Sequence, residues 1–347
     1  MNPNVMVVSS DAPENSRDPV GLNAAPAPDA AITVAHVSDP HIAYMNGIKP
    51  SELLSKRLLG YLKWILHRGA RHSDEILWAL VDDLKETRPD HIAVTGDLTH
   101  LSLPTEFLKA RQWLHALGSP SQVTVIPGNH DAYVHINWHQ AYAHWIDYMR
   151  SDKPPPQTDA PSGFDSVFPS LRIRECVAFI GICTANPSAP FLAVGRMGTK
   201  QLQKLQQILV QTSRQHLFRI LLIHHPPASG TVSWHKRLTD AKALRDIIAR
   251  HGAELILHGH AHRTVQKYLN GRPARVPVIG VPSASALVSA QPKRARYYIY
   301  RIWPNPDEWS VQLSTRIYSP DKHRFTAEKE WRFSMPHLSN ADGNRNP

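Results

Sequence analysis

Five short segments of the 347-residue chain end an apolar run in side chains that can bind metal ions. The segments are VSDPH (Asp39 and His41), VTGD (Asp97), IPGNH (Asn129 and His130), LIHHP (His224 and His225) and LHGHAH (His258, His260 and His262). His, Asp and Asn supply the nitrogen and oxygen ligands that suit Zn, Mn or Fe. There are enough of them for two ions rather than one.

Each segment taken alone has a simpler explanation. Asn, Asp and Gly favour tight turns, Asp also caps helices, and a lone His is commonly a satisfied core or loop residue. The recurrence of one design at five strand ends is what favours a shared site. In open α/β sheets, ligand sites gather outside the carboxyl ends of the strands. We therefore expect these side chains to converge on one pocket.

The segments between these motifs alternate between strands and helices. Short apolar runs predict strands at 31–39, 91–97, 121–131, 176–184, 217–227 and 253–262. Apolar residues at helical spacing predict helices at 73–87, 104–117, 199–211 and 240–252, with Ser73 as a cap and Gly252 as a stop. Alternation in 296–303 and 309–319 indicates strands of a half-exposed sheet. This order predicts an α/β (α+β) domain, a four-layer sandwich of two packed mixed β-sheets flanked by helices, over 31–336.

Composition separates this domain from the ends of the chain. Residues 1–30 are rich in Pro, Ala, Asn and Asp without periodicity, which predicts a disordered tail, and we expect another over 337–347. The Pro-rich stretch 151–163 predicts a loop. Cys176 and Cys183 fit neither a disulfide framework nor a zinc pair, so we expect a reducing, cytoplasmic compartment. No run reaches the roughly 20 apolar residues of a membrane span, and no signal peptide is recognisable.

The net charge of +10 favours anionic partners such as phosphates, nucleic acid or lipid headgroups. Segment 49–71 predicts an amphipathic helix in which Leu54, Leu58, Leu62 and Ile65 form an apolar stripe. This helix could cap the rim of the site, or it could bind an anionic membrane surface, which would make the protein peripheral to the membrane. Contact with nucleic acid or a partner helix is the third interpretation. No feature of the sequence indicates an oligomeric state.

The ordered set D-x-H, G-D, G-N-H-[D/E], H-x-P and G-H-x-H resembles the calcineurin-like metallophosphoesterases, and the match runs from Ala31 to about Ser285. Pro40 departs from the residues commoner at its position but removes no ligand. The resemblance implies two divalent or mixed-valence ions (Fe, Mn or Zn). It implies Asp39, His41 and His262 on the first ion, Asn129, His224 and His260 on the second, and Asp97 between them. It implies His130 as the catalytic histidine and favours His224 over His225 as a ligand.

Three further residues have weaker assignments. Asp131 could orient a neighbour of the metal site or cap a helix, and His225 could support the site from outside it. His100 lies near Asp97 in the sequence, and a His at this place resembles the nuclease branch of the family. A plain loop histidine is the alternative for His100.

The expected activity is hydrolysis of a phosphodiester by hydroxide generated at the two ions, which can lower the pKa of bound water to about 7. The compact spacing and the GRMGTKQLQKL segment resemble the bacterial cyclic-nucleotide phosphodiesterase branch. One alternative is hydrolysis of a lipid-linked phosphoester or pyrophosphate at a membrane surface, and another is a nuclease. A non-catalytic binding module on the same fold is the remote alternative, because the chain retains every metal ligand.

Overall fold

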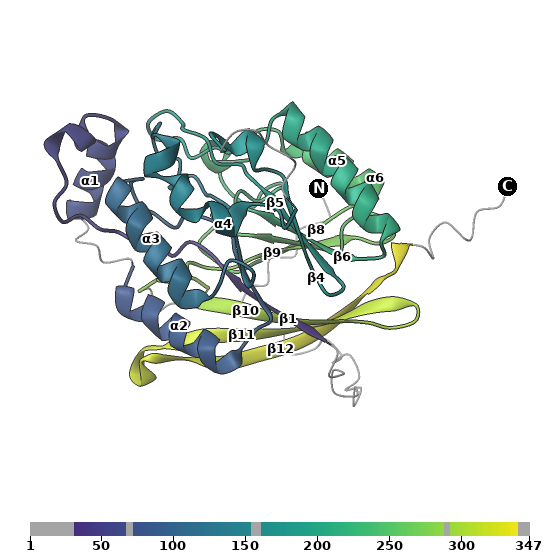
Figure 1. Ribbon diagram of the computed structural model, residues 1–347. Coiled ribbons are helices and arrows are strands. Elements are labelled where there is room, and N and C mark those ends of the chain that lie inside the picture. The colour runs from purple at the N-terminus through teal and green to yellow at the C-terminus, as the bar shows by residue number, and fades with distance from the viewer. Residues whose placement is uncertain (1–30, 67–71, 154–160, 288–291, 339–347) are drawn as a thin grey trace.

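The computed structural model of the protein describes residues 31–66, 72–153, 161–287 and 292–338. The tail expected over 1–30 lies outside these residues, as does the second expected tail except for 337 and 338. The middle of the Pro-rich stretch, 154–160, also lies outside them. The described chain forms two β-sheets with helices beside them (Figure 1).

The first sheet has six strands in the order β12-β11-β10-β1-β2-β3. Their bounds are β1 Ile32–Val37, β2 His91–Val94, β3 Val123–Val125, β10 Arg296–Pro304, β11 Glu308–Ser319 and β12 Arg324–Pro336. Strands β1, β2 and β3 run parallel, whereas β10, β11 and β12 form an antiparallel meander that joins β1. The carboxyl ends of β1, β2 and β3 therefore lie at one edge of this sheet.

The second sheet also has six strands, in the order β4-β5-β6-β7-β9-β8. Their bounds are β4 Ser170–Arg174, β5 Val177–Ile182, β6 Phe218–Ile223, β7 Leu255–His258, β8 Val265–Leu269 and β9 Val276–Gly280. The four central strands run parallel and are buried along their length, as their near-continuous apolar sequences require. The antiparallel strands β4 and β8 form the two edges.

The helices flank the sheets in the expected order. Their bounds are α1 Lys56–Leu66, α2 Asp74–Thr87, α3 Pro104–Leu117, α4 Ile146–Met149, α5 Thr199–Arg214 and α6 Ala241–His251. Ser73 caps α2, because its side chain accepts a hydrogen bond from the backbone N–H of Ile76. Gly252, with φ +67°, ends α6. Helices α5 and α6 cover the second sheet, and α2 and α3 lie beside the first (Figure 1).

The largest core lies where the two sheets face each other. Phe218 on β6 packs edge-on against Trp309 on β11, with ring centroids 5.5 Å apart. His91 on β2 packs on Phe179 of β5 at 4.1 Å. A second core beneath α5 and α6 buries Leu205 and Leu209 among others. Two mixed sheets with flanking helices confirm the predicted fold class.

The helix expected over 49–71 is shorter than predicted. A 3-10 turn covers Pro50–Leu53, and α1 begins only at Lys56. The Ser55 side chain accepts a hydrogen bond from the backbone N–H of Arg57, so it starts a new helix there. Residues 67–71 lie outside the described chain. Among the described helices, none combines the length and apolar character that crossing a membrane requires.

Candidate metal centre

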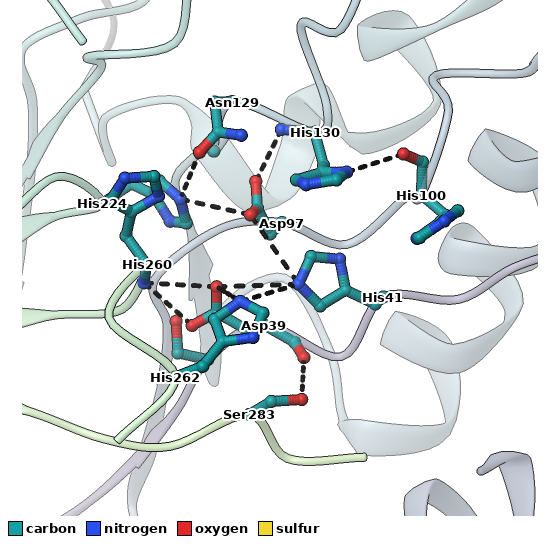
Figure 2. A network of polar contacts seen from close by, with 12 residues as sticks. Asp39, His41, Asp97, His100, Asn129, His130, His224, His260, His262 and Ser283 are labelled. Atoms are coloured by element: carbon teal, nitrogen blue, oxygen red, sulfur yellow. Dashed lines mark hydrogen bonds and ion pairs between the residues drawn. The ribbon is translucent and has the colours of Figure 1, made fainter. Parts of the chain in front are cut away.

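The expected ligands converge from five strand ends on one edge shared by the two sheets. Asp39 and His41 follow β1, Asp97 follows β2, and Asn129 follows β3. His224 follows β6 of the second sheet, and His260 and His262 follow β7. Figure 2 shows these side chains directed toward one another around Asp97. Segments more than 200 residues apart in the chain therefore meet at one site.

One group of potential ligands consists of Asp39, His41, Asp97 and His262, whose ligand atoms all lie within 4.8 Å of one another. The His262 Nε2 atom lies 3.2 Å from Oδ1 of Asp39 and 3.0 Å from Nε2 of His41. Nε2 of His41 lies 3.8 Å from Oδ2 of Asp97. Asp39, His41 and Asp97 are almost fully buried. These four residues include the three that we expected on the first ion.

A second group consists of Asp97, His224 and His260, again with ligand atoms within 4.8 Å of one another. The Nε2 atom of His224 lies 3.3 Å from Oδ2 of Asp97 and 3.1 Å from Oδ1 of Asn129. The Asn129 oxygen therefore lies close enough to this group to share a metal ion with it. Asp97 belongs to both groups, so its carboxylate occupies the position of a bridge.

The state of Asp97 fits a site for cations. Its Oδ2 atom is buried and accepts no well-aligned hydrogen bond among the described residues, although Nε2 of His224 lies 3.3 Å from it. A carboxylate oxygen in that position is costly unless a positive charge compensates it. Burial alone would lower the pKa of His224, but the nearby Asp97 carboxylate raises it to about 9. The arrangement that favours a proton between His224 and Asp97 equally favours a metal ion there, and the His, Asp and Asn donors suit Zn, Mn and Fe.

Backbone groups orient the two histidines of the second group. Nδ1 of His224 donates to the carbonyl of Thr95 at 2.7 Å, which leaves Nε2 to face Asp97. Nε2 of His260 donates to the carbonyl of Lys236 at 2.9 Å, which leaves Nδ1 for an ion. Such outer hydrogen bonds fix the tautomer and the ring orientation of metal-binding histidines.

The backbone at the site adopts an uncommon conformation. Five of the expected ligands have positive φ angles: Asp39 (52°), His41 (45°), Asp97 (55°), His260 (64°) and His262 (48°). This region is disfavoured for residues with a Cβ, and such residues cluster where function requires it. Gly128 allows the loop after β3 to approach, because a Cβ there would collide with Oδ1 of Asp97. The local chain is thus shaped to aim these side chains inward.

His130 is held beside the bridge without belonging to either of these two groups. Its backbone N–H donates to Oδ1 of Asp97 at 2.7 Å, and its ring Nδ1 donates to the carbonyl of His100 at 2.7 Å. This bond engages Nδ1 and not the second ring nitrogen, Nε2. Burial lowers the pKa of His130, while the Asp97 charge and the His100 carbonyl act in the opposite direction.

The three residues with weaker assignments all lie near the site. The ring of His100 stacks on His130 at 5.5 Å, and His41, His100 and His130 form a third group of closely spaced donors. Asp131 accepts hydrogen bonds from the backbone N–H groups of Gly128 and Thr99, both at 2.8 Å, so it ties the loop after β3 to the loop after β2. No helix begins at Asp131, so it does not cap one.

His225 lies behind the ligands. Its Nδ1 accepts from the hydroxyl of Thr184 at 2.7 Å, and its Nε2 faces the carbonyl of Ala193 at 3.2 Å. Burial lowers its pKa to about 3, which keeps the ring neutral. The ring packs 4.4 Å from that of His260. The structure therefore places His224 in the ligand group and His225 against it.

Two residues at the site were not expected from the sequence. The ring of His72 lies 4.6 Å from that of His41, and its Nδ1 lies 2.7 Å from Oγ of Ser285. The Ser283 hydroxyl donates to the carbonyl of Asp39 at 2.6 Å (Figure 2). Ser283 follows the end of β9, as the expected ligands follow other strands. Serine is not among the His, Asp and Asn residues that suggested metal binding in the sequence. His72 precedes the helix cap Ser73 and had no signal at all.

Comparison with known proteins agrees with this geometry. The family model for calcineurin-like phosphoesterases matches residues 32–264. A probable cyclic nucleotide phosphodiesterase from Synechococcus sp. is 28% identical over 222 residues, which cover 62% of this chain and 72% of that protein. The glycerophosphodiester phosphodiesterase GpdQ from Enterobacter lignolyticus is 34% identical over 98 residues, 28% of this chain and 29% of that one.

Solved structures show the same fold at low sequence identity. A dimetal phosphatase from Danio rerio has a TM-score of 0.51 and 12% identity, covering 88% of this chain and 99% of its own. The purple acid phosphatase PPD1 from yellow lupin (Lupinus luteus) has a TM-score of 0.53 and 12% identity, covering 90% of this chain and 55% of its own. Identities this low support the fold alone.

Proposed function

The chain belongs to the calcineurin-like phosphoesterases and is a metal-dependent phosphoric ester hydrolase, and from that premise we propose that it hydrolyses phosphodiesters at a binuclear metal centre. Asp39, His41 and His262 would hold one ion, and Asn129, His224 and His260 would hold the other. The observation that carries this proposal is the position of Asp97, whose carboxylate belongs to both groups of ligands. A shared carboxylate can hold two cations close together while offsetting their repulsion.

Two divalent ions at such a site supply Lewis-acid stabilisation of the phosphoryl oxygens and activate water as a nucleophile. Hydrolysis forms one bond from a water oxygen to phosphorus and breaks one phosphorus–oxygen ester bond. The leaving oxygen then requires a proton. Nε2 of His130 would supply it, because Nδ1 is engaged with the His100 carbonyl. A bound phosphate anion would raise the pKa of His130, since a nearby negative charge favours the imidazolium.

A diester is the favoured substrate class. The relatives named as a cyclic nucleotide phosphodiesterase and as a glycerophosphodiester phosphodiesterase both cleave diesters by their names. We therefore propose a small diester, a cyclic nucleotide or a glycerophosphodiester, rather than a monoester. Nucleic acid is also a diester, and His100 beside His130 together with the basic charge supports a nuclease as the second candidate.

The test compares bis(p-nitrophenyl) phosphate, a diester, with p-nitrophenyl phosphate, a monoester. The protein is treated with a chelator and reconstituted with Mn, Zn or Fe, and metal content is measured by mass spectrometry. We expect diester hydrolysis that returns with metal and is lost in Asp97→Asn, while the exposed Asp246→Asn serves as the control. Turnover of the monoester alone would overturn the diester assignment. Binding of a single ion would overturn the binuclear centre, and degradation of single-stranded DNA would favour the nuclease.

A further inference from the structure

Helix α1 presents large apolar side chains to solvent. Leu54, just before the helix, is 84% exposed, and Leu66 at its end is 79% exposed. Leu58, Leu59 and Leu62 are each about 45% exposed. In Figure 1 the helix stands at one end of the molecule, outside the two sheets. Single exposed apolar side chains are common on protein surfaces, whereas several together, as here, indicate an interaction site.

Contacts with the body fix the orientation of α1. The Arg57 guanidinium donates to the carbonyls of Leu101 and Ser102. Gly60 lets the helix approach closely, because a Cβ there would lie 2.5 Å from Cδ2 of Leu101 and 2.9 Å from the hydroxyl of Tyr133. The position of the helix is therefore fixed by these contacts, and the leucines face outward on a docked helix. Arg57 and Gly60 dock the helix on the body, with its apolar side turned away.

Two loops beside α1 also expose large apolar side chains. The Lys56 ammonium donates to the hydroxyl of Ser188 and to the carbonyl of Leu192, both at 3.2 Å, which joins α1 to loop 186–196. That loop pairs with loop 233–237 through the backbone N–H of Ala193 and the carbonyl of His235. Each loop exposes one large apolar side chain, Phe191 (87%) and Trp234 (69%). We call α1 with Leu54 and these two loops the apolar rim.

The apolar rim borders the metal centre directly. The Lys236 carbonyl in loop 233–237 accepts the hydrogen bond from Nε2 of His260. On the other side, the Lys56 ammonium lies 4.4 Å from the centroid of the Tyr133 ring, which stacks on His130 at 5.6 Å. A surface bound to the rim would therefore lie beside the candidate metal centre.

The charge of the rim identifies the surface that it fits. Residues 54–66, 186–196 and 233–237, which make up the apolar rim, contain six Lys and Arg residues and no acidic residue. Lys56 and Arg57 are engaged in hydrogen bonds to backbone carbonyls, whereas Arg196 is exposed. Lys236 and Arg237 are exposed directly beside Trp234. We propose that the apolar rim docks on an anionic lipid bilayer, with the Leu, Phe and Trp side chains entering the headgroup region and the cations contacting the lipid phosphates. Basic residues interspersed with exposed Leu and Trp are what interfacial binding requires.

A second copy of the chain fits this surface less well. Two copies related by a twofold axis would bring the same basic residues face to face, which costs free energy unless acidic groups lie opposite. An anionic bilayer instead provides apolar volume and negative charge together. Docking is independent of which phosphoester is cleaved, so it goes beyond the proposed function. It would give a substrate carried in a lipid headgroup direct access to the site.

The test is sedimentation of the full-length protein with vesicles of phosphatidylcholine alone or mixed equally with phosphatidylglycerol. We expect binding to the anionic vesicles that weakens with salt. Trp234→Ala, Leu58→Ser/Leu62→Ser and Arg237→Glu should each lower the partition coefficient roughly tenfold. Trp78→Ala is the matched control, because Trp78 is 51% exposed and belongs to α2, which is not part of the rim. Hydrolysis of soluble bis(p-nitrophenyl) phosphate, where it occurs, and melting temperature check that each variant is folded.

Three results would overturn the proposal. The first is the absence of binding to anionic vesicles by the folded wild-type protein. The second is binding that the rim variants retain or that Trp78→Ala reduces equally. The third is a wild-type dimer, seen by light scattering, that Leu58→Ser/Leu62→Ser converts to monomers, because the rim would then bind a second copy. None of these results bears on the metal centre, so docking and hydrolysis are tested separately.

Discussion

The Nε2 atoms of His41 and His262 lie 3.0 Å apart, although the two residues are 221 positions apart in the chain. Both atoms also approach Oδ1 of Asp39, at 3.9 and 3.2 Å. Burial and the neighbouring histidines lower the pKa of His41, so that ring is neutral at pH 7. Two imidazole nitrogens and a carboxylate oxygen directed at one point form a set of donors for a cation.

Removing one donor of this set should remove one ion. We expect His262→Ala to lower the bound metal from about two ions per chain to about one, because Asp97, His224 and His260 remain in place. Metal content after gel filtration, measured by mass spectrometry, gives the answer. His323→Ala is the control, since that exposed ring contacts Glu75 and belongs to none of the ligand groups. Unchanged metal content in His262→Ala would show that His262 is not a ligand.

The adjacent histidines His224 and His225 should behave differently. His224→Ala removes the nitrogen that faces Asp97 and Asn129, so we expect loss of an ion and of hydrolysis. His225→Ala removes a ring bonded to Thr184 and packed on His260, so we expect lower stability but the full metal content. Metal analysis together with thermal unfolding separates the two effects. The reverse pattern would exchange their roles.

His130 should contribute to the chemical step without contributing to metal binding. His130→Ala leaves every expected ligand in place, so metal content should be unchanged. Loss of a proton donor typically lowers the rate by roughly 10² to 10⁴. A substrate with a better leaving group needs less protonation, so the loss should be smaller for such a substrate. An equal loss for good and poor leaving groups would instead assign His130 to phosphoryl binding.

The convergence of the candidate ligands could be predicted from the sequence because their residue types indicate metal chemistry. His, Asp and Asn after apolar strands are visible without any structure, and parallel strands bring such ends together. The helices over 73–87 and 104–117 were similarly predictable, because Ser73 and Pro104 mark their starts. Local rules decided these elements, and the tertiary structure agrees with them.

Features that depend on tertiary contact were not predictable. His72 reaches the site because its ring contacts Ser285 and His41, which lie far from it in sequence. The true start of α1 depends on Ser55, within a longer amphipathic pattern that hid it. A glycine inside a helix is unfavourable by propensity, and Gly60 is explained only by the close approach of Leu101 and Tyr133. A sequence pattern shows which side of a helix is apolar, but it does not show which residues of other elements pack against that side.

Gly128 should be needed for its lack of a side chain. A Cβ at this position would collide with Oδ1 of Asp97 and lie 2.7 Å from Cε1 of His224. Overpacking of this kind typically costs about 1–3 kcal/mol. We expect Gly128→Ala to lower both the free energy of unfolding and the metal content, measured by urea denaturation and mass spectrometry. Gly163→Ala is the control, because no atom of the described chain lies within 4 Å of a Cβ there. Equal behaviour of the two variants would contradict the steric argument.

Glu106, near the start of α3, should make stability depend on pH. Burial raises its pKa from the ordinary 4.5 to about 7, against the backbone N–H groups of Leu103 and Leu101, which favour the charged form. Between these values the folded chain holds a proton that the unfolded chain has released. The stability contributed by this proton is therefore present at low pH and lost as pH rises through 7, and it amounts to about 3 kcal/mol.

Glu106→Gln keeps an acceptor for the two backbone N–H groups but cannot ionise. We therefore expect the variant to gain stability relative to the wild type on going from pH 5 to pH 8. Urea denaturation of both proteins at the two pH values measures this difference, and the other titrating groups cancel because both proteins contain them. If the difference in unfolding free energy were the same at both pH values, Glu106 would be ionised throughout. The positive charge of Arg57, which lowers the pKa of Glu106, would then outweigh the effect of burial.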